Sequence, residues 1–283
     1  MAIKRHTIPL TAVAGGAAAL ALRLWNLRAG FEPATGLPVS HPSFPALLAL
    51  FGAVMLALLL QARGLSDGGA PRFPFRAQNS APCVPAVAGM FLLALSGIAD
   101  LYEGAAGESV MDRLAGAAPT YQQYHYAGMI SAEAVGMGAG AQCACGLLAL
   151  LSAWAVFECV RACLRGDLKS RALVMLPAVA LSFRLVAVYR IDSVNPVLQD
   201  YAPALVALMF QVLGFYCFSA FAFDSGDLTA FAVSAGGAIC AAMCVLADET
   251  EYVSSPLTLC GSASALAGFL MLALQAPPAP RNE

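Results

Sequence analysis

The sequence predicts an all-α polytopic membrane protein, a bundle of about eight transmembrane helices with both termini in the cytoplasm. Charged residues make up 11% of the chain, less than half of the roughly 25% found in soluble domains. The mean hydropathy is +0.74. The apolar residues form continuous blocks that are long enough to cross a bilayer as helices, which takes about 20 residues each. The strands of a β-barrel would instead show short alternating patterns.

The composition also argues against several functional classes. The net charge is −2, and no basic patch with interleaved aromatic residues points to a nucleic-acid partner. The nine cysteines lie in or beside apolar runs, far in sequence from the three histidines. We therefore interpret them as small packing residues and expect no metal ion and no cofactor. No nucleotide-binding or hydrolase motif is present, so we assign no catalytic residue and do not expect an enzyme.

The first three predicted helices cover about residues 8–27, 44–63 and 84–103. The first follows Lys4 and Arg5 and could be a signal peptide, but its apolar run is longer than a typical signal core, so we interpret it as a retained helix. A loop rich in proline and glycine, residues 28–43, separates it from the second helix. The third helix carries its polar residues near its far end.

The segment 104–137 is the longest stretch between predicted spans. It is acidic at first and then contains three tyrosines between Tyr121 and Tyr126. Tyrosine is typical of the headgroup level of a membrane. We therefore expect an outer loop or an interfacial segment.

Five more helices are predicted at about 138–162, 172–191, 198–223, 228–247 and 256–275. Residues 1–275 would then form a single transmembrane domain, and residues 276–283 a disordered tail. Gln211 lies in the middle of the sixth helix, where an amide more often joins two helices than contacts a substrate. Glu158, near the end of the fourth helix, is expected to pair with Arg161 or Arg165.

The orientation follows from the lysines and arginines, which favour the cytoplasmic side of a membrane. With the N-terminus inside, the inner segments contain Lys4, Arg5, Arg63, Arg72, Arg76, Arg161, Arg165, Lys169, Arg171 and Arg281. The outer segments contain Arg28, Arg113 and Arg190. This asymmetry predicts that both termini face the cytoplasm, in a plasma membrane.

Several charged side chains lie at membrane depth, in the outer half of the predicted bundle. An arginine in hydrocarbon costs about 2.5–3.5 kcal/mol on insertion scales. Arg184 lies inside an apolar run, so we expect it to face the bundle interior and to have a partner, with Asp100 and Asp200 as the first candidates.

Two interpretations of these charges remain open. They could pair with one another and fix the helix packing, or the arginines could hold a carboxylate or a phosphate in an outward-facing cavity, since guanidinium groups bind both bidentately. The hypothetical ligand-binding set consists of Arg184, Arg23, Asp100, Asp200, Glu103 and Arg190.

Three functions are compatible with these patterns. The first is binding or transport of a small anionic solute through the polar cluster. The second is a non-catalytic structural or regulatory membrane component, which meets a second copy or another membrane partner through small-residue faces such as those of Gly237 and Gly261. The third is a cofactor-free membrane enzyme acting on lipids or envelope precursors.

Two stretches carry a family resemblance. The run F-R-L-x₃-Y-R-x-D-S-x-N-P-x-L-x-D-Y spans Phe183 to Tyr201, and G-F-E-P-A-T-G-L-P spans Gly30 to Pro38, shortly before His41 and Pro42. The chain resembles uncharacterised multi-pass membrane proteins of anaerobic Gram-positive bacteria. The resemblance implies a bacterial cytoplasmic membrane, and it implies no substrate or catalytic residue.

Overall fold

The computed structural model describes residues 2–32, 37–63, 65, 71, 73–75, 80–106, 137–192, 197–248 and 253–276. In this part of the chain, eight helices are long and apolar enough to cross a membrane. The described residues contain no strand beyond an isolated bridge between Phe31 and Pro38. The predicted class, an all-α multi-pass membrane protein in contact with a lipid bilayer, is therefore confirmed.

The eight spanning helices are α1 (Ala2–Ala29), α2 (Ser43–Ala62), α3 (Cys83–Ala106), α6 (Ala139–Arg165), α7 (Leu176–Asp192), α8 (Leu198–Ala220), α9 (Leu228–Val245) and α10 (Ser254–Gln275). The helix α3 continues to Ala106, into the predicted outer segment. Residues 107–136 of that segment, with its three tyrosines, lie outside the described residues, as does the predicted tail from residue 277 onward.

Prolines shape several helix starts. Pro45, Pro85 and Pro256 stand in the first turns of α2, α3 and α10, where the missing N–H would have no intrahelical partner. Pro177 has a larger effect. Because it cannot donate to the carbonyl of Leu173, that carbonyl accepts the N–H of Leu176 instead, and residues Arg171–Met175 form the 3₁₀ helix η3 before α7. The predicted fifth span is thus present, over Arg171–Ile191, with a 3₁₀ first part that runs directly into α7.

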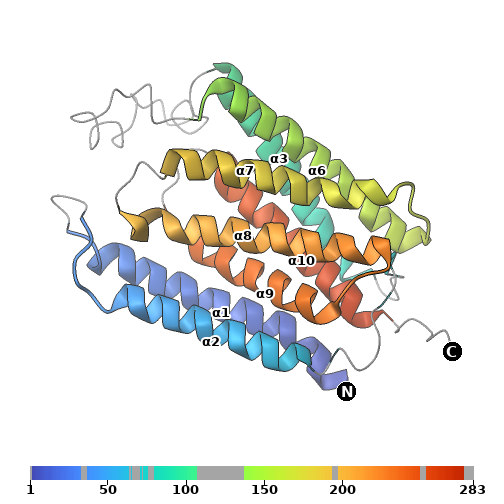
Figure 1. Cartoon of the computed structure of the whole chain (residues 1–283), viewed down its shortest axis with the longest axis horizontal. Helices are drawn as coiled ribbons and strands as arrows, with labels where there is room; N and C mark the ends of the chain where they lie inside the picture. The colour runs from blue at the N-terminus through green and yellow to red at the C-terminus, as the bar shows by residue number, and fades with distance from the viewer. Residues whose placement is uncertain are drawn as a thin grey trace.

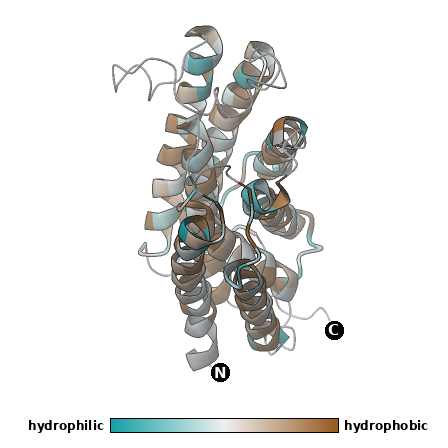
Figure 2. Cartoon of the chain, turned by 90° about the vertical axis from the view of Figure 1, so that its left-hand side faces the viewer, coloured by the Kyte–Doolittle hydropathy of each residue, from teal (hydrophilic) through white to brown (hydrophobic). Residues whose placement is uncertain are grey.

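The helices α9 and α10 lie at the centre of the bundle (Figure 1), where they pack against each other. Within an apolar stretch of 18 residues in each helix, 78% of α9 and 72% of α10 are buried, against 22% of α2. The helices α1, α2 and α8 also pack on α9, and α3 packs on α10. The helix α6 pairs with α3, and α7 lies between α6 and α8. Hydrophobic residues run along the helices (Figure 2), and large ones such as Leu48, Phe91 and Leu147 are exposed, as contact with lipid requires.

The two ends of the bundle differ in which helices begin and finish there. The end where α1 begins and α10 finishes, at the right in Figure 1, is called the terminal end. The opposite end, where α1 finishes and α2 and α10 begin, is called the distal end.

The crossing of α3 and α6 depends on glycine. A Cβ atom at Gly97 would lie 2.8 Å from the carbonyl oxygen of Gly146, and one at Gly146 would lie 2.8 Å from the carbonyl oxygen of Gly97. The two backbones therefore touch at this point, which is the close approach that small residues permit between membrane helices.

We expect Gly97→Ala to destabilise the protein by about 1–3 kcal/mol, because the added methyl group meets backbone atoms that cannot move aside cheaply. The measurement is the thermal midpoint, Tm, of the purified protein in detergent. Gly52→Ala is the control, since a Cβ there meets nothing within 4 Å, and its Tm should be equal or higher because alanine favours a helix. Equal Tm values for the Gly97 variant and the parent would contradict the assigned crossing.

Candidate functional site

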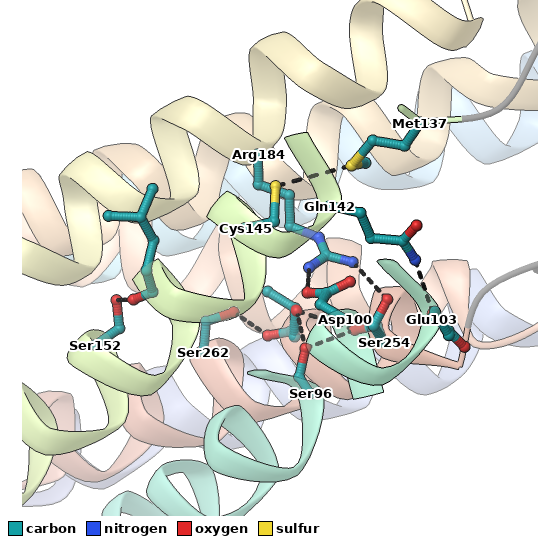
Figure 3. A network of polar contacts seen from close by, with 12 residues as sticks. Ser96, Asp100, Glu103, Met137, Gln142, Cys145, Ser152, Arg184, Ser254 and Ser262 are labelled. Carbon is teal, nitrogen blue, oxygen red and sulfur yellow. Dashed lines mark hydrogen bonds and ion pairs between the residues drawn. The ribbon is translucent and has the colours of Figure 1, made fainter. Parts of the chain in front are cut away.

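Arg184, on α7, lies inside the bundle with an exposed fraction of 4%. Its Nη1 donates to Asp100 Oδ2 of α3 at 2.6 Å, and its Nη2 donates to Ser254 Oγ of α10 at 3.1 Å. Figure 3 shows these groups pointing toward one another from three helices. The predicted interior position of Arg184 and its predicted pairing with Asp100 are thus confirmed.

A polar column continues from this ion pair along α10. Ser254, Thr258 and Ser262 stand four residues apart and share one face of the helix. The carbonyl oxygen of Ser254 accepts hydrogen bonds from Ser96 Oγ of α3 and from Thr258 Oγ1, both at 2.9 Å. These side chains are all buried. The column therefore ties α3 and α7 to the start of α10 through hydrogen bonds.

The column ends at Gln211 of α8. Ser262 Oγ donates to Gln211 Oε1 at 2.7 Å, and Gln211 Nε2 donates to the carbonyl oxygen of Leu259 at 2.8 Å. Ser262 lies about 12 Å along α10 from Ser254, at 1.5 Å per residue. Gln211 thus joins α8 to α10, as its position in the sequence predicted.

Beyond the column, aromatic side chains fill the core toward the terminal end. Phe218 and Phe269, each two turns further along α8 and α10, stack with ring centroids 4.3 Å apart. Phe75 meets Phe218 edge to face, and Phe231 lies tilted beside Phe218. Phe221 in turn meets Phe75 and Phe231 edge to face. All five rings are at most 1% exposed. The polar groups of the column therefore give way to a dry, close-packed cluster before they reach the terminal end.

Arg23, on α1, is the centre of a second cluster and is fully buried. Its Nε donates to Asp248 Oδ1, just after α9, at 2.6 Å. Its Nη1 donates to Asn26 Oδ1 and to the carbonyl oxygen of Gln199, and its Nη2 donates to the carbonyl oxygen of Asp200, each at 2.9 Å. Arg23 thus joins the distal ends of α1, α8 and α9.

Pro203 explains why a carbonyl oxygen of α8 is free to accept from Arg23. In an α-helix the carbonyl of Gln199 would accept the N–H of residue 203, but proline has none. Without another donor this partly buried carbonyl would be left unpaired, and leaving a buried acceptor unpaired costs about 1–3 kcal/mol. Arg23 supplies the donor. A proline four residues after Gln199 is the sequence signal that could have revealed this contact.

The hypothetical ligand-binding residues do not form one site. Arg184 and Asp100 belong to the polar column, whereas Arg23 belongs to the cluster around Asp248. Asp200, the other predicted partner of Arg184, contributes its backbone carbonyl to Arg23. The remaining two lie apart, as Glu103 accepts a hydrogen bond from Gln142 Nε2 of α6 at 3.1 Å, and Arg190 is exposed in the last turn of α7.

A small cavity touches Arg184. Its volume is about 10 Å³, and its lining includes Cys145, Ser152, Arg184, Thr258 and Ser262. About 10–15 Å³ of such volume is needed to hold one water molecule. The cavity therefore has room for about one water molecule, and a carboxylate or phosphate solute would not fit without movement of the surrounding helices.

A third ion pair lies near the terminal end. Glu158 is 4% exposed, and it accepts from Arg161 Nε at 2.8 Å and from Lys169 Nζ at 3.4 Å. The predicted pairing of Glu158 with Arg161 is confirmed. Because both partners are within or next to the same helix end, this contact stabilises the α6 terminus and does not link distant helices.

Comparisons with protein-family models, with curated proteins and with solved structures find no match to this chain. The proposed function therefore rests on the geometry of the structure. It shows an integral membrane protein whose two deeply buried arginines are each paired with a carboxylate of the same chain.

A double-mutant cycle tests whether the Arg184–Asp100 pair is structural. Arg184→Met leaves Asp100 as an unpaired buried carboxylate, and we expect a loss of about 3–5 kcal/mol. Adding Asp100→Leu removes the stranded charge, so the double variant should be more stable than the Arg184→Met variant. The measurement is Tm in detergent for the parent, both single variants and the double variant. Losses that simply add would contradict the pairing.

A second cycle tests the link between Pro203 and Arg23. Pro203→Ala restores an N–H that can bond to the carbonyl of Gln199, so Arg23→Met should cost less stability in that background, by about 1–3 kcal/mol. Pro9→Ala, inside α1 near the other end of the bundle, is the matched control and should leave the cost of Arg23→Met unchanged. The measurement is again Tm, and an equal cost in all three backgrounds would refute the link.

Proposed function

We propose that the protein is a non-catalytic structural or regulatory component of a bacterial cytoplasmic membrane, which acts by binding another membrane-spanning protein. One observation carries this proposal: the charges that could attract a solute are already satisfied within the chain. Arg184 bonds to Asp100 at 2.6 Å and Arg23 to Asp248 at 2.6 Å. The resemblance of two sequence stretches to bacterial multi-pass membrane proteins supports the choice of membrane.

Binding of an anion at Arg184 has a physical obstacle. An incoming carboxylate or phosphate would have to displace Asp100, which is 1% exposed. The displaced carboxylate would then be an unpaired charge in a medium of low dielectric constant, which is strongly unfavourable. The pair as a whole is neutral, so it attracts an anion much less than a lone arginine would.

The partner surface is better supported between α9 and α10. The glycines of the predicted small-residue faces are covered, since a Cβ at Gly237 would meet Phe210 of α8, and one at Gly261 would meet Leu93 of α3. A groove of about 190 Å³ nevertheless remains, lined by Ile239, Ala242, Met243, Leu246, Cys260, Ala263, Ser264 and Ala267. Small residues let helix backbones approach closely in lipid, so this groove suits an apolar transmembrane helix.

The arrangement of the termini supports the predicted orientation. The first spanning helix, α1, begins at the same end of the bundle at which the last one, α10, finishes (Figure 1). Both therefore belong on one side of the membrane. The basic residues Arg161, Arg165 and Lys169 stand at this terminal end. By the preference of lysine and arginine for the inner side, the terminal end faces the cytoplasm, and the distal end, with both arginine clusters, faces outward.

Photo-crosslinking in the native membrane tests the proposal. A photoreactive residue at Leu246, which lines the groove, should give a discrete protein adduct, whereas one at Leu48, a 58% exposed residue of α2, should not. Ala267→Leu fills the groove and should abolish the Leu246 adduct. Lipid adducts alone at both positions would count against a protein partner.

Binding of a small anionic solute is the second candidate, because Arg184 borders a small cavity that such a solute could enter if the surrounding helices moved. A melting screen with carboxylates and phosphates separates the two candidates. Stabilisation of the parent protein, and not of an Arg184→Ala variant, would support solute binding. The absence of any stabilising solute, together with a groove-dependent adduct, would support the partner function.

A further inference from the structure

The Arg23 cluster extends to the protein surface through a chain of side chains at the distal end. Arg23 Nη1 donates to Asn26 Oδ1 at 2.9 Å, and Asn26 Nδ2 donates to Ser43 Oγ at 3.0 Å. Ser43 Oγ lies 2.9 Å from His41 Nδ1, and the backbone N–H of Ser43 donates to the same nitrogen at 3.3 Å. The chain thus joins α1 to the start of α2.

The direction of these hydrogen bonds is fixed by chemistry. A guanidinium group can only donate, so Asn26 must turn its oxygen to Arg23 and its NH₂ to Ser43. The Ser43 hydroxyl then accepts from Asn26 and has its proton left for His41. The Ser43 N–H can also only donate. His41 Nδ1 is therefore the final acceptor, and the bonded imidazole is neutral with its proton on Nε2.

The surroundings hold this chain in place. A Cβ atom at Gly30 would lie 2.5 Å from Asn26 Nδ2 and 3.3 Å from Ser43 Oγ, so glycine is needed beside the link between them. The rings of Trp25 and His41 meet edge to face, with centroids 5.1 Å apart. Because Ser43 is the first residue of α2, the orientation of His41 fixes how this helix starts.

We propose that His41 is a proton-sensing site, and that its protonation removes the acceptor of the Ser43 N–H and thereby loosens the start of α2 where it bonds to the Arg23 cluster. An imidazolium ion carries hydrogen on both nitrogens and accepts from neither. The Ser43 hydroxyl can rotate to accept instead, but the Ser43 N–H loses its acceptor. An imidazole nitrogen accepts a hydrogen bond only while it carries no proton, so lowering the pH acts against the bonded state.

Other charged groups lie at the same end and must be separated from His41. They include Arg23 and Arg28 of α1, Glu32 of the connecting segment, Glu103 of α3, Arg190 of α7, Asp200 of α8 and Asp248 after α9. Burial raises the pKa of Asp248, although the hydrogen bond and the charge of Arg23 act against this rise. Asp248 is therefore the main alternative source of a response to acid.

Tryptophan fluorescence reports on His41 directly. The chain has two tryptophans, so Trp154→Phe leaves Trp25, in contact with His41, as the single emitter. A protonated imidazole quenches indole emission, so we expect the Trp25 signal to fall as the pH is lowered. His41→Asn keeps an acceptor near the Nδ1 position but does not titrate, so it should abolish this change. A flat signal in the Trp154→Phe protein would overturn the proposal.

The second readout is stability. Between pH 7.5 and pH 5.5 the Tm of the parent should fall by about 2–4 °C more than that of the His41→Asn variant. His6→Asn and His125→Asn should behave as the parent does. An equal fall in the His41→Asn protein, or its loss in an Asp248→Asn protein alone, would assign the response to another group and overturn the proposal.

A variant that keeps His41 provides an independent check. Gly30→Ala disturbs the bond between Asn26 and Ser43, so Trp25 should still titrate while the extra loss of Tm at pH 5.5 disappears. If the Gly30→Ala protein keeps the full loss of Tm, the hydrogen-bond chain does not transmit the protonation, and the proposal fails.

Discussion

The bundle depends on the burial of two guanidinium groups in a region that lipid keeps free of water. Lipid tails are as apolar as leucine, so the hydrophobic effect gives little preference for one helix neighbour over another. A buried arginine does give such a preference, because it must meet a carboxylate. Arg184 thereby brings α7, α3 and α10 together, and Arg23 brings α1, α8 and α9 together. The helices α1 and α8 pack on α9, α3 packs on α10, and α7 packs on α8. Both arginines therefore act around the central pair α9 and α10.

The two halves of the bundle are stabilised by different interactions. The distal half contains the arginine pairs and the polar column, in which partners, distances and directions are specific. The terminal half contains the stacked and edge-packed rings around Phe218 and Phe269, where contact is close but tolerant of small shifts. Sliding of one helix along another would therefore break ion pairs at the distal end, whereas at the terminal end it would only shift contacts between rings.

The spans, the interior position of Arg184 and its pairing with Asp100 could be predicted because each follows from local composition and from the cost of burying a charge. The separation of Arg23 from Arg184 could not, since the sequence does not say which helix ends are neighbours. Asp200 shows a further limit: its backbone carbonyl contacts Arg23, and a pattern of side-chain types gives no information about carbonyl groups. The contact with Gln199 could have been predicted more easily, because Pro203 marks a carbonyl without an intrahelical donor.

The pairing of the charges also constrains how a partner can bind. With Arg23 and Arg184 already satisfied, a partner helix gains nothing from neutralising them, so its affinity must come from close apolar packing and shape. The groove at Ala242, Ala263 and Ala267 offers such packing in the distal half. Its α9 wall finishes at Leu246, two residues before Asp248, the carboxylate that holds Arg23. A helix bound in the groove would therefore lie next to the Arg23 cluster, to which His41 is connected through Ser43 and Asn26. Partner binding and the protonation of His41 would then both act on this cluster.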